Sequence, residues 1–164
     1  MLISLQKKMK EQKGFTLIEL LAVIVILGII SAIAIPSITG LINNTKKDAH
    51  IANARQMAQS ARLYVADQKV NITTTGSDIT LTELISKGYM EEPKDPSKQG
   101  YNLTDSKVSV KKESSSSDKV VYIVTLKGGS TTYTNSTRNS TSNNQTSTTT
   151  LDAFDLNRDD ITLP

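Results

Sequence analysis

The N-terminal third of the chain is dominated by one long apolar run. Between Phe15 and Ile35 the 21 residues include a single ionisable side chain, Glu19. A helix of this length reaches about 31 Å, which is enough to cross the hydrocarbon core of a bilayer, about 30 Å thick. Lysines in segment 7–13 precede the run, as is typical of the cytoplasmic flank of a membrane helix. The pattern therefore predicts a membrane-spanning helix with one carboxylate near its start.

After Pro36 the apolar positions become sparser but keep a helical period. They recur every three or four residues and form one stripe: Ile51, Ala54, Met57, Ala58, Ala61, Tyr64 and Val65. We therefore expect a single helix over about 15–68, with a membrane half (15–39) and an amphipathic half (40–68). Pro36 lacks an amide hydrogen and Gly28 weakens the helix, so a kink is expected at these residues. For His50 we expect a solvated or partly packed side chain rather than a metal ligand.

The rest of the chain, 69–164, predicts a small globular head. Segment 71–78 is expected to be a loop, and Thr80 and Glu83 form a potential capping box for a short helix that ends before Gly88. Alternation over 107–111 and the β-branched run 120–126 predict two strands. Gly128 and Gly129 predict a turn, after which a third strand can follow over 130–135. We expect an α+β fold in which the long helix packs on this antiparallel sheet.

Segment 136–150 consists almost wholly of Ser, Thr, Asn and Gln. It has too little apolar surface to offset the entropy lost on ordering, so it predicts a flexible surface loop. Leu151, Phe154 and Leu156 follow this segment, and we expect them to hold the tail against the head.

The junction between the basic flank and the apolar run carries a specific motif. Residues 13–19 read KGFTLIE, which resembles the processing site of type IV pilins and pseudopilins, and the resemblance continues to Gly28 and Pro36. It implies that segment 1–14 is a leader peptide, that a prepilin peptidase cuts after Gly14, and that Phe15 is then N-methylated. It also implies that Glu19, fifth in the mature chain, guides subunit assembly.

The same resemblance implies a type IV pilin-like fold, and a filament subunit for adhesion, motility or DNA uptake. Two alternatives within the family stay open: a competence pseudopilin and a major pseudopilin of type II secretion. The implied partners are further copies of the chain, minor pilins, the prepilin peptidase, the assembly platform with its ATPase, and membrane lipid before assembly. The implied location is the inner or cytoplasmic membrane, as a single-pass protein with its head outside, and then a cell-surface filament.

Two interpretations outside the family also remain open. The first is an ordinary signal peptide, for which residues 32–34 (Ala-Ile-Ala) supply the small-x-small cleavage pattern. The second is a plain single-pass anchor. Either would make the chain a processed or anchored binding protein. Against a signal peptide, the apolar run is longer than a typical signal core and contains Glu19.

The composition argues against direct nucleic-acid binding and against disulfide bonds. The net charge of +3 suggests nucleic-acid binding, but segment 1–14 alone carries four lysines and one glutamate, which accounts for the whole excess. We therefore expect no direct nucleic-acid binding. The chain has no cysteine, so no disulfide is available, unlike in many Gram-negative pilins. This absence fits the cysteine-free pilins of Gram-positive bacteria.

No phosphate loop, nucleophile elbow or His/Cys cluster is present in the sequence, so we expect neither catalysis nor a cofactor. One weak metal candidate remains in the tail, where the side chains at alternate positions resemble the opening of a calcium loop. Its residues are Asp155, Asn157, Asp159 and Asp160. The turn glycine of such a loop is missing, although major secretion pseudopilins do bind calcium in this region. We expect a solvated acidic tail, with calcium binding as the alternative.

Overall fold

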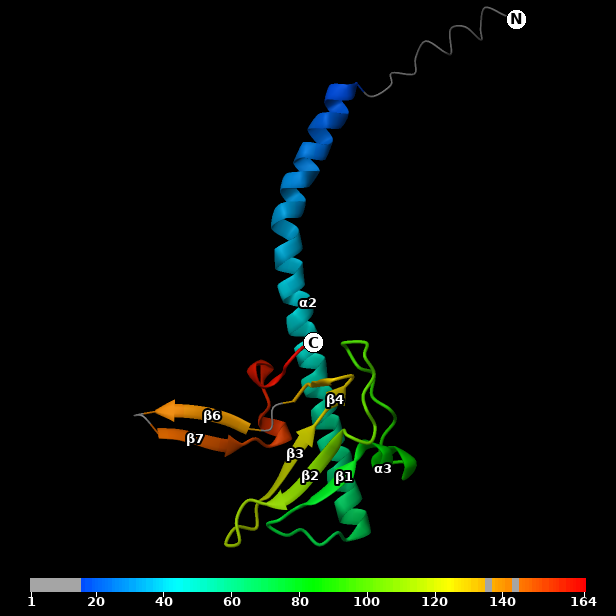
Figure 1. Ribbon diagram of the computed structural model, residues 1–164. Helices are drawn as coiled ribbons and strands as arrows, with labels where there is room; N and C mark the ends of the chain where they lie inside the picture. Colours follow the sequence, from blue (N-terminus) through cyan, green and yellow to red (C-terminus); the bar gives the residue numbers. More distant parts are fainter. Residues whose placement is uncertain (1–15, 135–136, 143–144) are drawn as a thin grey trace, which may run out of the picture. The chain divides into compact units, whose positions relative to one another are not determined.

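The computed structural model describes residues 16–134, 137–142 and 145–164 (Figure 1). The chain divides after Leu41 into two compact units. The first contains the N-terminal part of helix α2 (Leu17–Gln68), and the second, which we call the head unit (42–164), contains the rest of α2 and all the strands. A long helix and a small antiparallel sheet make an α+β fold, which confirms the predicted fold class.

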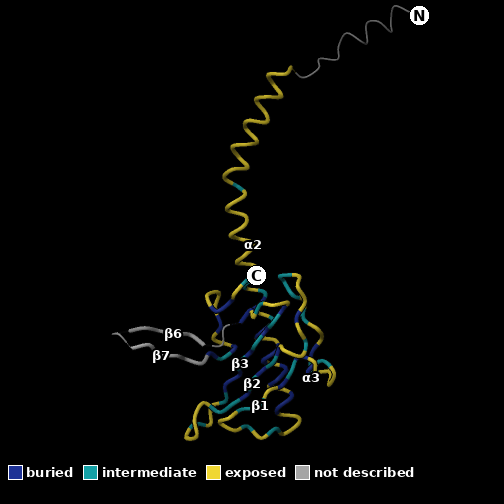
Figure 2. The backbone as a smooth tube through the Cα atoms, in the orientation of Figure 1, coloured by how far each residue is buried: buried dark blue, intermediate teal, exposed yellow. Residues whose placement is uncertain are grey.

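The N-terminal part of α2 exposes its apolar side chains. Its large apolar side chains between Leu17 and Leu41 are each at least 46% exposed, and Figure 2 shows almost all of this backbone as exposed. Among the described residues, α2 is the one helix that is long and apolar enough to cross a membrane, judged by length and composition. It runs through Gly28 and Pro36 without a break, and the kink at these residues stays a prediction. Such a surface has to be covered by lipid or by other protein.

Inside the head unit, α2 buries the stripe that the helical period predicts. Ala54, Met57, Ala58 and Ala61 have no exposed surface, and the remaining stripe residues are also buried. Three of these four side chains are alanines, so the sheet can approach the helix backbone closely, while the flexible Met57 fills the remaining space. The predicted amphipathic half is therefore confirmed, and α2 ends at Gln68 as expected.

A three-stranded antiparallel sheet, in the order β1-β2-β3, packs against this stripe. Its strands are β1 (Ser77–Thr80), β2 (Lys107–Lys112) and β3 (Val120–Thr125). The register pairs Val108 with Val124 and Val110 with Tyr122, and these four side chains are buried in the core. Residues between them, such as Lys107 and Ser109, lie on the other face because side chains alternate along a strand.

The third strand of this sheet differs from the predicted one. The described part of the predicted 130–135 strand does not join the sheet; instead β5 (Thr131–Thr132) pairs with β4 (Lys127–Gly128) in a separate two-residue ladder. The turn between them is confirmed, with Gly129 at φ +56°. The third strand is β1, which includes the end of the predicted 71–78 loop. With one buried apolar residue, Ile79, in four positions, β1 carries too little periodicity to be recognised.

The short helix α3 (Leu81–Ser86) follows β1 directly. Thr80 caps it as predicted, because its hydroxyl accepts a hydrogen bond from the Glu83 amide at 3.2 Å. Glu83 differs from the prediction: its carboxylate accepts from the Tyr64 hydroxyl at 2.5 Å and so joins α3 to α2. Gly88 follows the helix at φ +78°, a conformation that favours glycine.

The described residues of the polar segment 136–150, which we expected to be a flexible surface loop, form two strands. Strands β6 (Thr137–Ser142) and β7 (Gln145–Thr150) form an antiparallel hairpin, in which Thr137 pairs with Thr150. Figure 1 shows this hairpin extending away from the β1–β3 sheet. Lack of apolar surface did not prevent strand pairing, because threonine favours extended backbone and two extended strands satisfy each other's amides and carbonyls.

The tail after β7 returns to the core through two 3-10 helices, η1 (Ala153–Asp155) and η2 (Arg158–Asp160). Leu151 and Leu156 are buried, which confirms them as the residues that hold the tail. Phe154 is 38% exposed and meets the edge of Tyr122 at a centroid distance of 6.5 Å, so its part in holding the tail is smaller than expected.

Candidate functional site

The start of α2 is organised around Glu19. Its Oε2 atom accepts hydrogen bonds from the Thr16 amide and the Thr16 hydroxyl, both at 2.9 Å. In return, the Glu19 amide donates to the Thr16 hydroxyl at 3.3 Å. This reciprocal pattern is a capping box that satisfies amides at the exposed helix start. We did not predict it, although the spacing of Thr16 and Glu19 is the one that such a box requires.

This geometry places the predicted assembly residue in the first turn of an uncovered apolar helix. Glu19 Oε1 receives no hydrogen bond within the part of the chain that the structure describes. Gly14 and Phe15, the predicted cleavage and methylation residues, lie outside the described residues. One oxygen of the carboxylate is therefore held by two hydrogen bonds from Thr16, while the other is available to a cation or a hydrogen-bond donor from another molecule.

Gly28 and Pro36, the predicted kink residues, both lie within α2. A Cβ atom added at Gly28 would meet no atom within 4 Å. Packing within this chain therefore does not require a glycine there, and any need for a small residue has to come from a neighbouring molecule.

A second constellation lies inside the head unit, around His50. This histidine is fully buried, so our expectation of a solvated or partly packed side chain was wrong. Its Nδ1 lies 2.8 Å from the Tyr101 hydroxyl and its Nε2 lies 3.0 Å from the Ser97 hydroxyl, while its ring stacks on Tyr133 at 4.1 Å. Because Asn53 donates to the Tyr101 oxygen at 3.0 Å, the Tyr101 proton is directed to Nδ1. Neutral His50 therefore carries its proton on Nε2 and donates to Ser97.

Asp95 completes this group, which we call the His50 cluster (His50, Asn53, Asp95, Ser97, Tyr101 and Tyr133). The Asp95 side chain is 2% exposed. Its oxygens accept from the amides of Ser97 and Gln99 and from the Tyr133 hydroxyl, at 2.8, 3.0 and 3.0 Å. The sequence pattern Pro-x-Asp-Pro at 93–96 marked this segment as irregular, but nothing in it indicated the partner on α2.

Burial sets the protonation of the cluster. It lowers the pKa of His50, although the Asp95 carboxylate, 3.7 Å from Nε2, acts in the opposite direction. Burial also raises the pKa of Tyr101, and burial with the hydrogen bond to Asp95 raises the pKa of Tyr133 to about 12. At neutral pH the cluster therefore contains neutral His50 and protonated tyrosines. Its hydrogen bonds tie the 93–101 segment to α2.

Two of the four calcium candidates in the tail, Asn157 and Asp160, cap a short helix. Asn157 accepts from the Asp159 amide at 2.9 Å, and Asp160 accepts from the Asn157 amide at 2.9 Å, so the two side chains form a capping box for η2. Asp155 and Asp159 are exposed. Within the described ranges, no three His, Cys, Asp or Glu side chains are grouped so that they could hold a metal ion. The spacing of Asn157 and Asp160 therefore serves a helix cap, and calcium binding in this segment stays a prediction to be tested.

The geometry at the helix start agrees with a match to known proteins. Residues 9–35 match the family model described as the prokaryotic N-terminal methylation motif. The chain is also similar to type II secretion system core protein G of Vibrio cholerae, with 32% identity over 95 residues, or 58% of this chain and 63% of that protein. In this motif and in this relative the chain resembles the type IV pilin and pseudopilin family.

Two further relatives are a second core protein G and a fimbrial protein. Core protein G of Pseudomonas aeruginosa is 30% identical over 93 residues, which cover 56% of this chain and 63% of that protein. A fimbrial protein of Pseudomonas aeruginosa is 35% identical over 80 residues, which cover 46% and 52%. The chain thus spans less than two thirds of the length of these relatives. No solved structure matches significantly.

These matches confirm the resemblance drawn from residues 13–19. The matched segment contains Gly14, Phe15, Glu19 and Gly28. The exposed apolar half of α2, which follows this motif, has the length and composition of a membrane-spanning helix.

Proposed function

We propose that this protein is a structural subunit of a type IV pilus. A prepilin peptidase removes the leader, 1–14, after Gly14, and Phe15 becomes the N-methylated first residue. Residues 15–39 hold the subunit in the membrane and later line the filament core, while 40–68 carry the globular part, 69–164. The assembly platform and its ATPase then add the subunit, with further copies and minor pilins, to a surface filament for adhesion, motility or DNA uptake.

The observation that carries this proposal is the uncovered apolar half of α2 behind the methylation motif. Large apolar side chains from Leu17 to Ile38 are each at least 46% exposed, so their burial requires first lipid and then neighbouring helices. The extended polar hairpin β6–β7 supports the pilus over a pseudopilus, because such a polar projection suits a surface displayed to the environment.

Glu19 has a specific role in this proposal. A carboxylate inside the bilayer costs several kcal/mol unless it is protonated or paired. Cleavage after Gly14 creates a cation at the same depth, the methylated α-amine of Phe15. We assign the uncommitted Oε1 of Glu19 to this amine on a neighbouring subunit that is already in the filament. Because an unpaired charge is penalised, the pair favours subunits that dock in register.

Replacing Glu19 tests the proposal directly. In a strain without wild-type subunit, Glu19→Ala protein is expected to insert into the membrane and to be cut at Gly14, but to accumulate as membrane monomer. Shearing, fractionation and mass spectrometry of the N-terminus measure these steps separately. Asp118→Ala, which removes an exposed carboxylate at the far end of the head unit, is the matched control and should assemble normally. Abundant Glu19→Ala protein in sheared filaments would refute the pairing.

The second candidate is a pseudopilin of a competence or type II secretion system, and the two core protein G relatives favour it. The two functions predict different phenotypes at native expression. A pilus subunit yields long filaments that shearing releases, and its deletion removes them. A pseudopilin yields no such filaments, and its deletion abolishes protein secretion or DNA uptake instead.

A further inference from the structure

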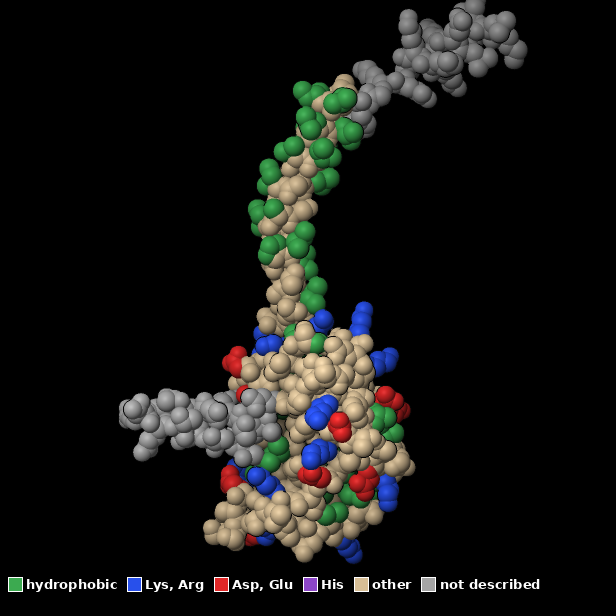
Figure 3. All heavy atoms as spheres, in the orientation of Figure 1, with side chains coloured by type: hydrophobic (Ala, Val, Ile, Leu, Met, Phe, Trp, Pro, Cys, Tyr) green, Lys and Arg blue, Asp and Glu red, His purple; other side chains and the backbone are tan. Residues whose placement is uncertain are grey.

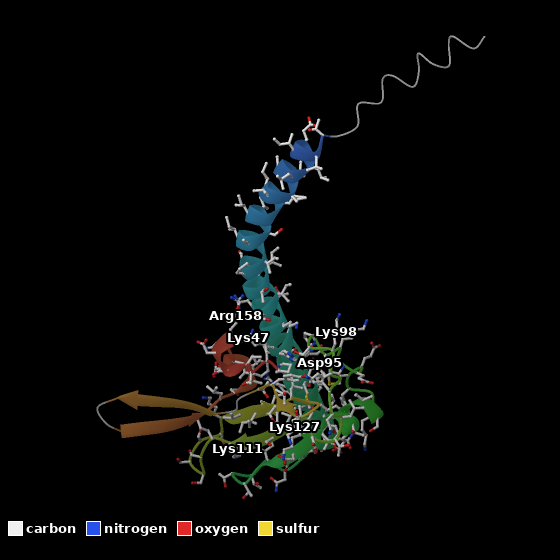
Figure 4. The ribbon with its side chains drawn as sticks, turned by 45° about the horizontal axis from the view of Figure 1, so that its top comes forward. Lys47, Asp95, Lys98, Lys111, Lys127 and Arg158 are labelled. Atoms are coloured by element: carbon white, nitrogen blue, oxygen red, sulfur yellow. The ribbon has the colours of Figure 1, made fainter. Side chains whose placement is uncertain are left out.

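Four lysines gather at the end of the head unit where the chain enters at Ile42. Lys46 and Lys47 lie on α2, and Lys94 and Lys98 lie on the 93–100 segment. In Figure 4, Lys47 and Lys98 are labelled on either side of α2 at this end, while Lys111 and Lys127 lie further toward the opposite end. Figure 3 shows several Lys and Arg side chains around the same end. We call these four residues the basic rim.

The His50 cluster holds the segment that carries two of the rim residues, Lys94 and Lys98. The Asn53 side chain donates to the Lys94 carbonyl at 2.9 Å, and Ser97 bonds to His50. Asp95, between them, accepts from the Ser97 and Gln99 amides and so closes the backbone around Lys98, which lies at φ +62°. The segment that presents Lys94 and Lys98 is therefore attached to α2 within two turns of Lys46 and Lys47.

The charge of the basic rim is not neutralised within the chain. Lys107, Lys112, Lys119 and Lys127 each form an ion pair with a carboxylate, but none of the four rim lysines does so among the described residues. Of the nearby acids, Asp48 is engaged by Arg158 through two hydrogen bonds of 2.6 Å. Asp95 is buried, and Glu92 lies beside Lys94 and Lys98 on the wall of one open pocket. The rim therefore keeps an excess of positive charge.

We propose that the basic rim binds the anionic phospholipid headgroups of the membrane that holds the apolar half of α2. This inference rests on the membrane-held stage of the proposed function and on no later step. Lys46 is four residues beyond Ile42, the last large residue of the exposed apolar run, which is about 6 Å along a helix. That distance is within the screening length of about 8–10 Å at physiological salt, so the lysines act on headgroup phosphates. Clusters of basic residues directly beside a membrane helix are the pattern that anionic lipids attract.

The binding has a consequence for assembly. A subunit waiting in the bilayer has its head held against the membrane surface, and this contact is broken when the subunit is extracted into a filament. Each lysine near an anionic surface contributes about a fivefold change in the ratio of docked to undocked heads. Loss of the rim therefore increases the free motion of the head without changing the anchor.

The full chain tests this in lipid vesicles. It contains no cysteine, so a single reporter can be placed at Gln99→Cys, beside the rim, or at Ser116→Cys, in the distant 113–119 loop. A fluorophore on the cysteine is quenched by lipids that carry a spin label on the headgroup. Vesicles of phosphatidylcholine alone are compared with vesicles that also contain phosphatidylglycerol. We expect quenching at Gln99→Cys to increase with phosphatidylglycerol and to decrease in high salt, while the Ser116→Cys reporter shows neither change.

Two sets of substitutions connect the effect to the rim. Changing Lys46, Lys47, Lys94 and Lys98 to Gln should abolish the phosphatidylglycerol-dependent quenching, and Lys94→Gln or Lys98→Gln alone should reduce the docked ratio by up to about fivefold. The matched control changes four lysines away from the rim, Lys69, Lys87, Lys111 and Lys119, and should leave the quenching unchanged.

Four results would overturn the proposal. Equal quenching in both kinds of vesicle, or equal loss in the control set, would show that the rim does not select anionic lipid. Quenching that follows the ratio of protein to lipid rather than phosphatidylglycerol would assign the rim to a second copy of the chain. Failure of the wild-type chain to float with vesicles would refute the membrane-held stage as well, whereas flotation without lipid-dependent quenching refutes the rim alone.

Discussion

His50 is the only histidine in the chain, which makes the pH dependence of head stability a clean test of the His50 cluster. In the unfolded chain its pKa is about 6.5. Burial lowers this pKa in the folded state, with Lys46 acting in the same direction and Asp95 against it. The unfolded state therefore binds more protons than the folded state below about pH 6.5. The stabilisation that neutral His50 contributes is therefore complete above that pH, and it is lost as the pH falls from there toward the lower pKa of the folded state.

The size of this loss of stability follows from the one additional proton that the unfolded state binds. Stability changes by at most about 1.4 kcal/mol per pH unit between the two pKa values, so lowering the pH from about 7.5 to about 5.5 costs up to about 1.4 kcal/mol. For a unit of this size that is about 4–6 °C in Tm. His50→Gln removes the titration, and it also removes the stacking on Tyr133 and the two hydrogen bonds of the imidazole ring. We expect it to cost about 2 kcal/mol at neutral pH, with no further loss on acidification to about pH 5.5.

Thermal unfolding of the full chain in detergent micelles measures both effects, with tyrosine fluorescence or near-UV circular dichroism as the signal. The window above about pH 5.5 excludes the ordinary titration of carboxylates. The difference between wild type and His50→Gln removes the contribution of the N-terminal amine, because both proteins carry it. A wild-type Tm that is constant from pH 7.5 to 5.5, or that falls equally in His50→Gln, would refute the assignment of a neutral, buried histidine.

Three further outcomes are expected. Gly128→Ala should destabilise the head unit by about 2 kcal/mol or more in the same melt, because its Cβ would lie 2.5 Å from the Tyr133 hydroxyl; an unchanged Tm would contradict the close packing. Gly14→Val should accumulate uncut precursor, visible by mass spectrometry, because a side chain at the scissile bond hinders close approach of the peptidase to the backbone; normal maturation at Phe15 would show that the junction is assigned wrongly. Millimolar calcium should raise the Tm by less than about 1 °C over chelator, because binding to the folded state alone would stabilise it; a clear rise would restore the calcium alternative for 155–160.

Those parts of the molecule that are specified by a pattern of neighbouring residues could be predicted from the sequence. The apolar run from Phe15 and the stripe from Ile51 to Val65 follow from helical periodicity, because a helix face is defined by residues three and four apart. The resemblance to the pilin family likewise follows from residues 13–19, where the basic flank, the Gly-Phe junction and an acid at the start of the apolar run coincide. The β2 and β3 strands were equally visible, since their alternation and β-branched content are local properties.

The tertiary structure decided whatever depends on partners distant in the chain. Strand β1 exists because the edge of β2 satisfies its backbone groups, and its own sequence carries little signal. The polar hairpin β6–β7 is likewise held by backbone pairing that composition does not report. His50 looked like one more residue of a solvated helix face until Ser97 and Tyr101, about fifty residues away, covered it and bonded both ring nitrogens. Sequence alone determined which faces are apolar and which family motif the chain carries, because both are read over a few neighbouring residues. Which polar groups are buried was decided only when the folded chain brought their partners within hydrogen-bonding distance.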